Sequence, residues 1–217
     1  MIDEKRARRG LALVFLILLM DMIGIAIIMP VMPAYLKELT GADPTEAVLE
    51  GSLLFVVYSA MQFLFGTFIG NLSDRFGRRP ILLASVLSFA IYNLICAMAG
   101  SYAMLFVGRV LAGISGASYA TASAYVADIS TDDNRARNFG LVGISFGVGF
   151  TLGPVIGGLL GELGPRVPFY VAAGIAFLNF LVALALLPET LDREHRRPFE
   201  WTRANPLGGL LQLRNYN

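Results

Sequence analysis

The chain has 217 residues, of which 56% are hydrophobic and 15% are charged, and its formal net charge is +1. Soluble domains carry about 25% charged residues, so this composition excludes an ordinary soluble domain and favours an integral membrane protein. The lack of a basic folded face also argues against nucleic-acid binding. The single cysteine, Cys96, lies in an apolar run, where we expect it to serve only in packing.

Six apolar segments are each long enough to cross a bilayer as a helix, which takes about 20 residues. In chain order they are Leu11–Leu36, Gly51–Gly70, Ile81–Gly100, Met104–Val126, Gly140–Gly161 and Val167–Leu187. Backbone groups in lipid must be hydrogen-bonded within their own segment, so we expect helices. No small-x-small cleavage site follows the first apolar stretch, and we expect that span to be retained. The sequence therefore predicts an all-α integral membrane fold.

Lysine and arginine are distributed unevenly between the connecting segments. Of the 17, only Lys37 and Arg166 lie in loops on one side, and Arg109 lies within a span. All the others lie in the first ten residues, in the loops after the second and fourth spans, and after the sixth span. Because cytoplasmic loops are enriched in these residues, we expect a multi-pass plasma (inner) membrane protein with both termini in the cytoplasm.

The loop between the second and third spans reads GNLSDRFGRRP, and its charge contrasts with the apolar runs on either side. Its glycines suit a tight turn, and Pro80 suits the first turn of the next helix. The spacing G-x-L-x-D-R-x-G-R-R fills every fixed position of the loop motif of the major facilitator superfamily. The motif residues are Gly70, Leu72, Asp74, Arg75, Gly77, Arg78 and Arg79. Nearly the whole chain resembles the N-terminal, six-helix half of a twelve-helix transporter of this family, in its tetracycline-efflux-like drug:proton antiporter branch.

This resemblance implies that the loop motif is a conformational latch. In the family the motif's aspartate pairs with cationic and helix-end groups near the cytoplasmic ends of neighbouring helices. We expect Arg135, between the fourth and fifth spans, to be the local partner of Asp74, and Asp128 to be a candidate partner for the arginines. Such an ion network can form in one conformation and break in another. The alternative is a turn that only sets topology.

Two charged residues, Asp21 and Arg109, lie well inside predicted spans. Intramembrane ionisable residues are costly and mark functional sites by default. Burial favours the protonated form of a carboxyl group, which suits a proton carrier. The resemblance implies that Asp21 lines the substrate path or couples protons, and that Arg109, followed four residues later by Gly113, serves proton coupling. The alternatives are helix-to-helix hydrogen bonding for Asp21, and snorkelling or structural pairing for Arg109.

Three further polar residues in the spans, Gln62, Tyr92 and Asn93, are weaker candidates for the substrate path. Polar residues in spans often only bridge helices, and this alternative stands for each of them. Tetracycline exporters carry an aspartate in the third span where this chain has Tyr92. This departure argues against tetracycline itself as the substrate.

The fifth span contains glycines at four-residue spacing, namely Gly149, Gly153, Gly157 and Gly161. They share one helix face and permit close helix packing, and Pro154 is expected to kink the helix. The pattern G-x-x-x-G-P-x-x-G-G matches the fifth-helix signature of the antiporter branch, with Gly149, Gly153, Pro154, Gly157 and Gly158 at its fixed positions. The resemblance implies that this stripe meets a helix of the other transporter half.

These features predict proton-coupled efflux of a small amphipathic compound or drug by alternating access. We divide the chain into a cytoplasmic N-terminus (1–10), a six-helix transporter half (11–187) and a cytoplasmic linker (188–217). The apolar spans favour an amphipathic compound, a cationic one included. The proton is the coupling ion, and the sequence contains no cofactor motif, no metal-ligand cluster and no catalytic motif such as HExxH or GxSxG, so we do not expect an enzyme.

A six-helix half makes only half of a substrate cavity, because such carriers bind substrate between two halves. The missing C-terminal half would belong to the same chain, to a separate chain or to a second copy of this one. The alternative function is a non-transporting half-transporter, either a truncated product or a modulatory or scaffold membrane protein.

Overall fold

The computed structural model describes residues 4–41 and 43–204, which are almost entirely helical. The helices are α1 (Glu4–Ala26), α2 (Met32–Thr40), α3 (Pro44–Phe76), α4 (Arg78–Ala97), α5 (Tyr102–Gly116), α6 (Tyr119–Asp128), α7 (Arg135–Gly161), α8 (Val167–Leu186) and α9 (Trp201–Ala204), with a 3-10 turn at Arg193–His195. Residues 1–3 of the predicted N-terminus and 205–217 of the predicted linker, which include Arg214, lie outside the described residues.

Six helical segments are long and apolar enough to cross a membrane, which confirms the predicted all-α fold with six spans. They are Ala7–Ala26, Thr45–Phe76, Arg78–Ala97, Tyr102–Asp128, Arg135–Gly161 and Val167–Leu186. Two of them extend well beyond the predicted boundaries, because the polar ends of α3 and α7 continue the helix. Asp43 caps the start of α3, where its Oδ1 accepts hydrogen bonds from the backbone N–H groups of Thr45 and Glu46.

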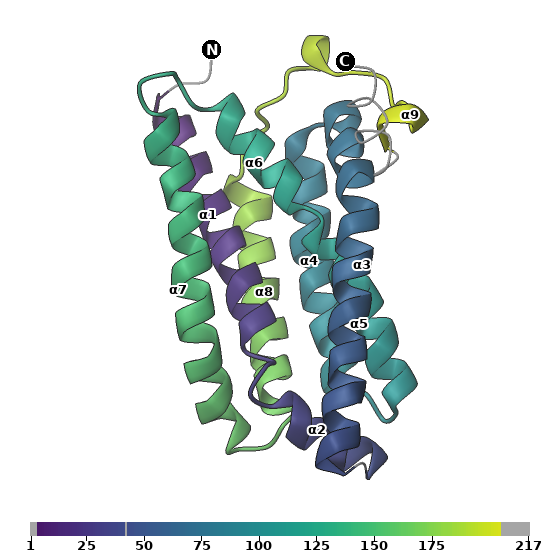
Figure 1. Cartoon of the computed structure of the whole chain (residues 1–217). Coiled ribbons are helices and arrows are strands. Elements are labelled where there is room, and N and C mark those ends of the chain that lie inside the picture. The colour runs from purple at the N-terminus through teal and green to yellow at the C-terminus, as the bar shows by residue number, and fades with distance from the viewer. Residues whose placement is uncertain (1–3, 42, 205–217) are drawn as a thin grey trace, which may run out of the picture.

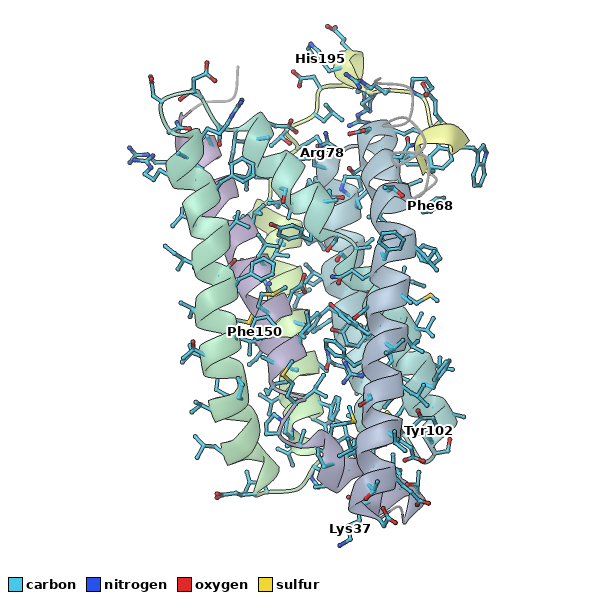
Figure 2. All side chains as sticks on the ribbon, in the orientation of Figure 1. Lys37, Phe68, Arg78, Tyr102, Phe150 and His195 are labelled. Carbon is cyan, nitrogen blue, oxygen red and sulfur yellow. The ribbon has the colours of Figure 1, made fainter. Side chains whose placement is uncertain are left out.

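The spans form one bundle in which α1 packs along α7, α4 along α8, and α3 along α5 (Figure 1). We call one end of the bundle the charged end. It holds the start of α1, the junction of α3 with α4, the loop from α6 to α7 and the segment after α8. The far end holds α2 and the loops before α5 and α8. Arg78 and His195 lie at the charged end and Lys37 lies at the far end (Figure 2).

The first predicted span is interrupted, and the prediction of a single helix over Leu11–Leu36 was wrong. The helix α1 ends at Ala26, a turn follows over residues 27–31, and α2 begins at Met32. Pro30 lacks a backbone N–H, and a proline ring clashes with the carbonyl four residues earlier, here that of Ala26. At the other end α1 begins at Glu4, so the described part of the predicted N-terminal segment is helical rather than a separate tail.

The fourth predicted span is also divided, into α5 and α6. The backbone N–H of Ala117 reaches the carbonyls of both Gly113 and Ile114, at 3.3 Å each, and that of Ser118 reaches Ser115 at 3.1 Å. Kinks of this kind occur at glycine and serine pairs, and the sequence here reads AGISGAS.

The stretch GNLSDRFGRRP is mostly helix, contrary to the predicted turn. The helix α3 continues through Phe76, and α4 starts at Arg78, so the reversal takes place at Gly77 alone. Gly77 has φ 106°, a conformation that favours glycine. A Cβ atom at Gly77 would also collide with the Glu189 carboxylate. Pro80 stands in the first turn of α4, as predicted.

The glycine stripe of α7 packs against α1 and the turn after it. Cβ atoms at Gly149, Gly153, Gly157 and Gly161 would overlap Met22, Ala26, Ile27 and Val31 respectively. The four-residue spacing therefore gives close packing, as predicted, but the partner helix lies in this half and not in another one. Pro154 lies inside α7, which is continuous around it, and Gly158 lies on a different face, with open space around its Cα.

Candidate functional site

Three neighbouring cavities lie among α1, α3, α5 and the α5–α6 junction, and the first of them extends to α2 at the far end. The Arg109 cavity, of about 420 Å³, opens between α1, α2 and α3, with Arg109 of α5 in its wall. The Gln62 cavity, of about 410 Å³, extends between α3, α6 and α7. A smaller Asp21 cavity lies between α1 and α4. Ile25 and Tyr58 line all three.

Asp21 lies in α1, near its end, and faces the smallest cavity together with Tyr58 and Tyr92. Its side chain is buried, with 9% of the residue exposed. Within residues 4–41 and 43–204, Asp21 forms neither a hydrogen bond nor an ion pair. No hydrogen bond within the described residues therefore supports the alternative that Asp21 bridges two helices. Hydrophobic neighbours such as Phe89 and Leu18 complete the wall.

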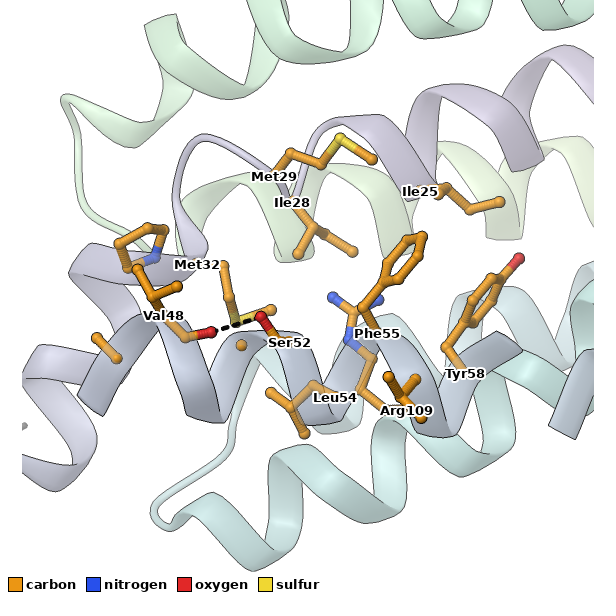
Figure 3. Close-up of a pocket in the computed structure, with 14 residues that line it drawn as sticks. Ile25, Ile28, Met29, Met32, Val48, Ser52, Leu54, Phe55, Tyr58 and Arg109 are labelled. Carbon is orange, nitrogen blue, oxygen red and sulfur yellow. Dashed lines mark hydrogen bonds between the residues drawn. The ribbon is translucent and has the colours of Figure 1, made fainter. Parts of the chain in front are cut away.

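Arg109 points its guanidinium group into the Arg109 cavity, between Ile28 and Phe55 (Figure 3). The residue is 8% exposed, and its Nε has no hydrogen-bond partner. Gly108 and Gly113, on either side, let α5 approach α4 and α3 closely: a Cβ at Gly108 would overlap Cys96 Sγ, and one at Gly113 would overlap the carbonyl of Tyr58. Close packing thus places the arginine in the cavity wall.

Of the three weaker candidates, Tyr92 and Gln62 line cavities and Asn93 does not. Tyr92 is 3% exposed, lines the Asp21 cavity and packs on Phe89 with ring centroids 5.1 Å apart. Gln62 lines its own cavity, and its Nε2 donates to the Gly116 carbonyl at 3.1 Å, which also bridges two helices. Asn93 lines none of the three cavities and donates to the Phe89 carbonyl at 2.9 Å. The structure therefore brings together the other candidates and leaves Asn93 out.

Tyr58 is the residue that sequence reasoning missed. It is 6% exposed, lines every one of the three cavities, and its hydroxyl accepts a hydrogen bond from Gln62 Nε2 at 3.3 Å. In the sequence it stands in the apolar run LLFVVYSAM, where a tyrosine gives no periodic signal. Its spacing of four residues from Gln62 places both side chains on one helix face, and that spacing was the available clue.

At the charged end, Arg78 is the centre of an ion network and is 8% exposed. Its Nη1 lies 2.5 Å from Asp74 Oδ1 and 2.7 Å from Ser73 Oγ, and its Nε lies 3.3 Å from Asp128 Oδ2. The network therefore joins the end of α3, the start of α4 and the end of α6. The expectation that Asp128 is a partner for the arginines is met by Arg78.

The expected pair of Asp74 with Arg135 is not formed. Arg135 is exposed and lies 3.9 Å from Asp132, in its own loop. Arg75 is exposed and lies over the Phe76 ring, whereas Arg79 Nη2 donates to the Leu184 carbonyl of α8 at 2.7 Å. Arg78 lies directly across the reversal at Gly77 from Asp74 and reaches it without crossing to another loop, which explains the difference.

Gly70, the first residue of the motif, lies within α3, where a Cβ would only touch Ala120 of α6 at 3.9 Å. Among the motif glycines, the structural demand for glycine is therefore strong at Gly77 and weak at Gly70.

Glu189 is a second residue whose role the sequence did not reveal. Its Oε1 accepts hydrogen bonds from the backbone N–H groups of Arg78 at 2.9 Å, Thr190 at 3.0 Å and Leu191 at 3.2 Å. A carboxylate at a helix N-terminus satisfies free N–H groups and opposes the helix dipole. Glu189 thus caps α4 from the end of α8.

The segment after α8 folds back over the end of α3. Phe199 lies edge-to-face on Phe68, with centroids 5.4 Å apart, and Asn71 Nδ2 donates to the Glu200 carbonyl at 2.7 Å. The backbone N–H of Arg197 donates to the Asp74 carbonyl at 3.1 Å. The described part of the predicted linker therefore contacts the helix that carries the loop motif.

At the far end, Arg166, which precedes α8, connects that helix to α2. Its Nε donates to Glu38 of α2 at 2.9 Å, and its guanidinium carbon lies 5.1 Å from the centroid of the Tyr35 ring. The hydrogen bond to Glu38 raises the pKa of the Arg166 guanidinium. These contacts hold the short helix α2 against α8 where the first span is interrupted.

Comparison with known proteins identifies relatives along most of the chain. A family model described as Major Facilitator Superfamily matches residues 14–217. The chain is 43% identical over 188 residues to "Tetracycline resistance protein, class C" of Escherichia coli, which covers 87% of this chain and 47% of that protein. It is 33% identical over 177 residues to "Quinolone resistance protein NorA" of Staphylococcus aureus strain Mu50, which covers 80% of this chain and 43% of that protein.

A solved structure shows the same arrangement of helices. The crystal structure of the human organic anion transporter MFSD10 (TETRAN) matches with a TM-score of 0.76 and 27% identity, over 88% of this chain and 50% of that chain. The chain spans about half the length of the curated relatives it matches.

Proposed function

The chain belongs to the Major Facilitator Superfamily, and from that premise we propose that it is the N-terminal half of a proton-coupled exporter of small amphipathic compounds. As a member of a transporter family it is an integral membrane protein and not an enzyme. Similarity to tetracycline and quinolone resistance proteins supports drug efflux. The observation that carries the proposal is Asp21, a buried carboxyl group in the first span with no ion partner among the described residues, next to cavities large enough for a ligand.

In this proposal, alternating access exposes the cavities to one side of the membrane at a time, and Asp21 exchanges a proton for cargo. Tyr58 and Tyr92 complete the wall that Asp21 faces. Arg109 contributes positive charge to the neighbouring cavity. The network of Asp74, Arg78 and Asp128 acts as the latch, because it joins three helix ends that can separate in another conformation.

We propose the following organisation. Residues 1–10 form the cytoplasmic start, 11–187 the six-helix half, and 188–217 the cytoplasmic linker toward a C-terminal half. The uneven distribution of lysine and arginine supports this orientation. The C-terminal half belongs to the same chain, a second chain or a second copy. In such a complex, Gly158 and the open face of α7 face the other half, since its stripe is already covered by α1.

An intact-mass measurement on protein from its native membrane distinguishes these arrangements. A mass near 23.5 kDa means that the half exists as its own chain. A mass roughly twice as large means that both halves share one chain, as expected of a two-half carrier.

The transport proposal is tested with everted membrane vesicles that contain the complete carrier. Addition of tetracycline or a quinolone to vesicles with an acidic interior is expected to release protons, followed with a pH-sensitive dye. Asp21→Asn should reduce this release to the level of vesicles without the carrier, and Asp21→Glu should retain part of it. Release by Asp21→Asn that equals the wild type at every pH would contradict the role of Asp21. An absence of release by any variant, with every compound tried, would support the non-transporting alternative.

A further inference from the structure

Among the described residues that line the Arg109 cavity, Arg109 is the one charged side chain. Its wall consists of apolar residues from α1, α2 and α3, among them Ile28, Met32 and Phe55, with Ser52 and Tyr58 as the polar members (Figure 3). No acidic residue belongs to this wall. The Ser52 hydroxyl is occupied, because it donates to the Val48 carbonyl at 2.7 Å. The cavity therefore presents an apolar surface with one positive charge.

That positive charge has no partner within the described residues. Arg109 forms no ion pair, its Nε has no hydrogen-bond acceptor, and only 8% of the residue is exposed. Asp21, the other buried charge in the spans, lies in the wall of a different cavity and is not bonded to it. A buried cation without a counter-ion is costly, so an anionic group from outside the chain would remove that cost.

The chemistry of a guanidinium group indicates which anion fits. Its planar fork matches the two oxygens of a carboxylate or the oxygens of a sulfonate or phosphate. The volume of about 420 Å³ falls in the range of small-molecule sites, and Met29 and Met32 provide flexible, polarisable surface for a variable apolar body.

We propose that the Arg109 cavity is a subsite for an amphipathic organic anion, with Arg109 as the counter-ion of its acidic group and Phe55, Ile28 and the methionines around its apolar body. This proposal rests on the proposed export function and narrows its substrate class. It also reverses the expectation from the sequence that a cationic compound is a suitable cargo, because a cation would meet Arg109 at close range.

The test compares two probes that share an aromatic body and differ in charge. Anilinonaphthalene sulfonate is anionic and phenylnaphthylamine is neutral, and both gain fluorescence on binding. The full-length protein is placed in phosphatidylcholine discs, and the dissociation constant of each probe is measured for the wild type, Arg109→Gln and Arg109→Lys. Arg137→Gln is the matched control, because it removes an exposed cation at the start of α7, outside the cavity.

Arg109→Gln is expected to weaken binding of the sulfonate by about tenfold or more, as for loss of a charge-assisted hydrogen bond, while the neutral probe changes little. Arg109→Lys should retain part of the difference, and Arg137→Gln should bind both probes as the wild type does. Equal losses of both probes, or no loss of the sulfonate, would overturn the proposal.

A second pair keeps the test decisive where Arg109→Gln fails to fold. Ser52→Glu adds a carboxylate to the cavity wall, and Ser52→Gln adds a neutral group of the same size. The sulfonate should bind Ser52→Glu several-fold more weakly than Ser52→Gln, with no difference for the neutral probe. Identical sulfonate affinities in the two variants would contradict an anion subsite.

A lipid phosphate could meet the same chemistry, so one arm repeats the measurement in discs with added phosphatidylglycerol. Unchanged sulfonate affinity supports a free compound as the occupant, whereas displacement from the wild type but not from Arg109→Gln would assign the site to a lipid headgroup and overturn the cargo assignment. Binding is measured without transport. The two proposals can therefore fail separately. If the carrier does not export but its binding still depends on the charge of the probe, only the export proposal is refuted. If the carrier exports but binds both probes without regard to charge, only the subsite proposal is refuted.

Discussion

Both the charged end of the bundle and the cavities at its middle contain buried ionisable side chains, but the two regions treat them differently. At the charged end, Arg78 is 8% exposed and contacts Asp74, Asp128 and Ser73. In the middle, Asp21 and Arg109 are as deeply buried, and neither has an ion partner among the described residues. The same burial therefore coincides with full pairing in one place and with none in the other.

The difference indicates separate tasks. Paired charges that join three helix ends favour one arrangement of those helices, and breaking the pairs favours another. Unpaired charges inside the membrane are costly to the fold, and that cost is understandable where the charge takes up a proton or binds cargo. We therefore expect variants at the charged end to change how fast the carrier cycles, and variants in the middle to change what it binds and couples.

The largest effect at the charged end is expected for Asp74→Asn in the complete carrier. Loss of the Asp74 charge leaves Arg78 with Asp128 alone and removes a bias between conformations. We expect turnover to fall by about tenfold, which corresponds to about 1.4 kcal/mol, with little change in substrate affinity. The kinetics of export in vesicles separate the two. Asp132→Asn, at an exposed carboxylate, is the control. Turnover equal to the wild type, or a change confined to affinity, would refute the latch.

A glycine pair on α7 tests whether α1, which carries Asp21, depends on close packing. Gly157→Ala places a Cβ against the carbonyl of Ile27, whereas Gly158→Ala places one in open space. Overpacking costs about 1–3 kcal/mol, while alanine in an unobstructed helix position gains about 0.5–1 kcal/mol over glycine. Thermal unfolding of the purified chain should show a lower Tm for Gly157→Ala and an equal or higher Tm for Gly158→Ala. Equal shifts in both would show that α7 is not in close contact with Ile27, just after the end of α1.

Glu189→Gln tests the cap that joins the end of α8 to the start of α4. The amide retains an acceptor oxygen but loses the negative charge, and hydrogen bonds to charged groups contribute about 1.5–3 kcal/mol. Because the Glu189 side chain is 27% exposed, we expect a loss of stability of about 1.5 kcal/mol. This loss should lower the Tm by a few degrees. Glu194→Gln, at an exposed carboxylate of the 3-10 turn, should leave the Tm unchanged. A drop of the same size in both variants would argue against the cap.

The smallest effect is expected at the far end. The Arg166 and Glu38 side chains are 32% and 45% exposed, and ion pairs of this kind contribute about 0.2–1 kcal/mol and weaken with salt. Arg166→Gln should lower the Tm slightly at low ionic strength and not at high ionic strength. A large, salt-independent loss would mean that the contact with Tyr35 matters more than the ion pair.

The sequence predicted the spans well because length and hydropathy decide them. It also identified Asp21 and Arg109 as charged residues within spans, because charges stand out in apolar runs. The end of α1 could have been predicted from Pro30, because a proline inside a helix removes a backbone hydrogen bond. The motif around Asp74 was read as a turn because of its glycines, although only Gly77 leaves the helix.

Contacts between segments distant in sequence were the part that could not be predicted. Arg78 reaches Asp128 because only the fold places the start of α4 beside the end of α6. Glu189 reaches the start of α4 across more than a hundred residues, and no local pattern records that. Tyr58 gains its position from the close approach of α3 and α5 at Gly113.

The separation of tasks between the two regions is tested by measuring two activities in the same vesicles of the complete carrier. One is export driven by a pH gradient, and the other is exchange of labelled for unlabelled substrate without a gradient. Asp21→Asn should lose gradient-driven export and keep exchange, because cargo still binds and the carrier still cycles. Asp74→Asn should slow both activities by the same factor. Gradient-driven export by Asp21→Asn, or equal behaviour of the two variants, would contradict the assignment of coupling to the middle and of cycling to the charged end.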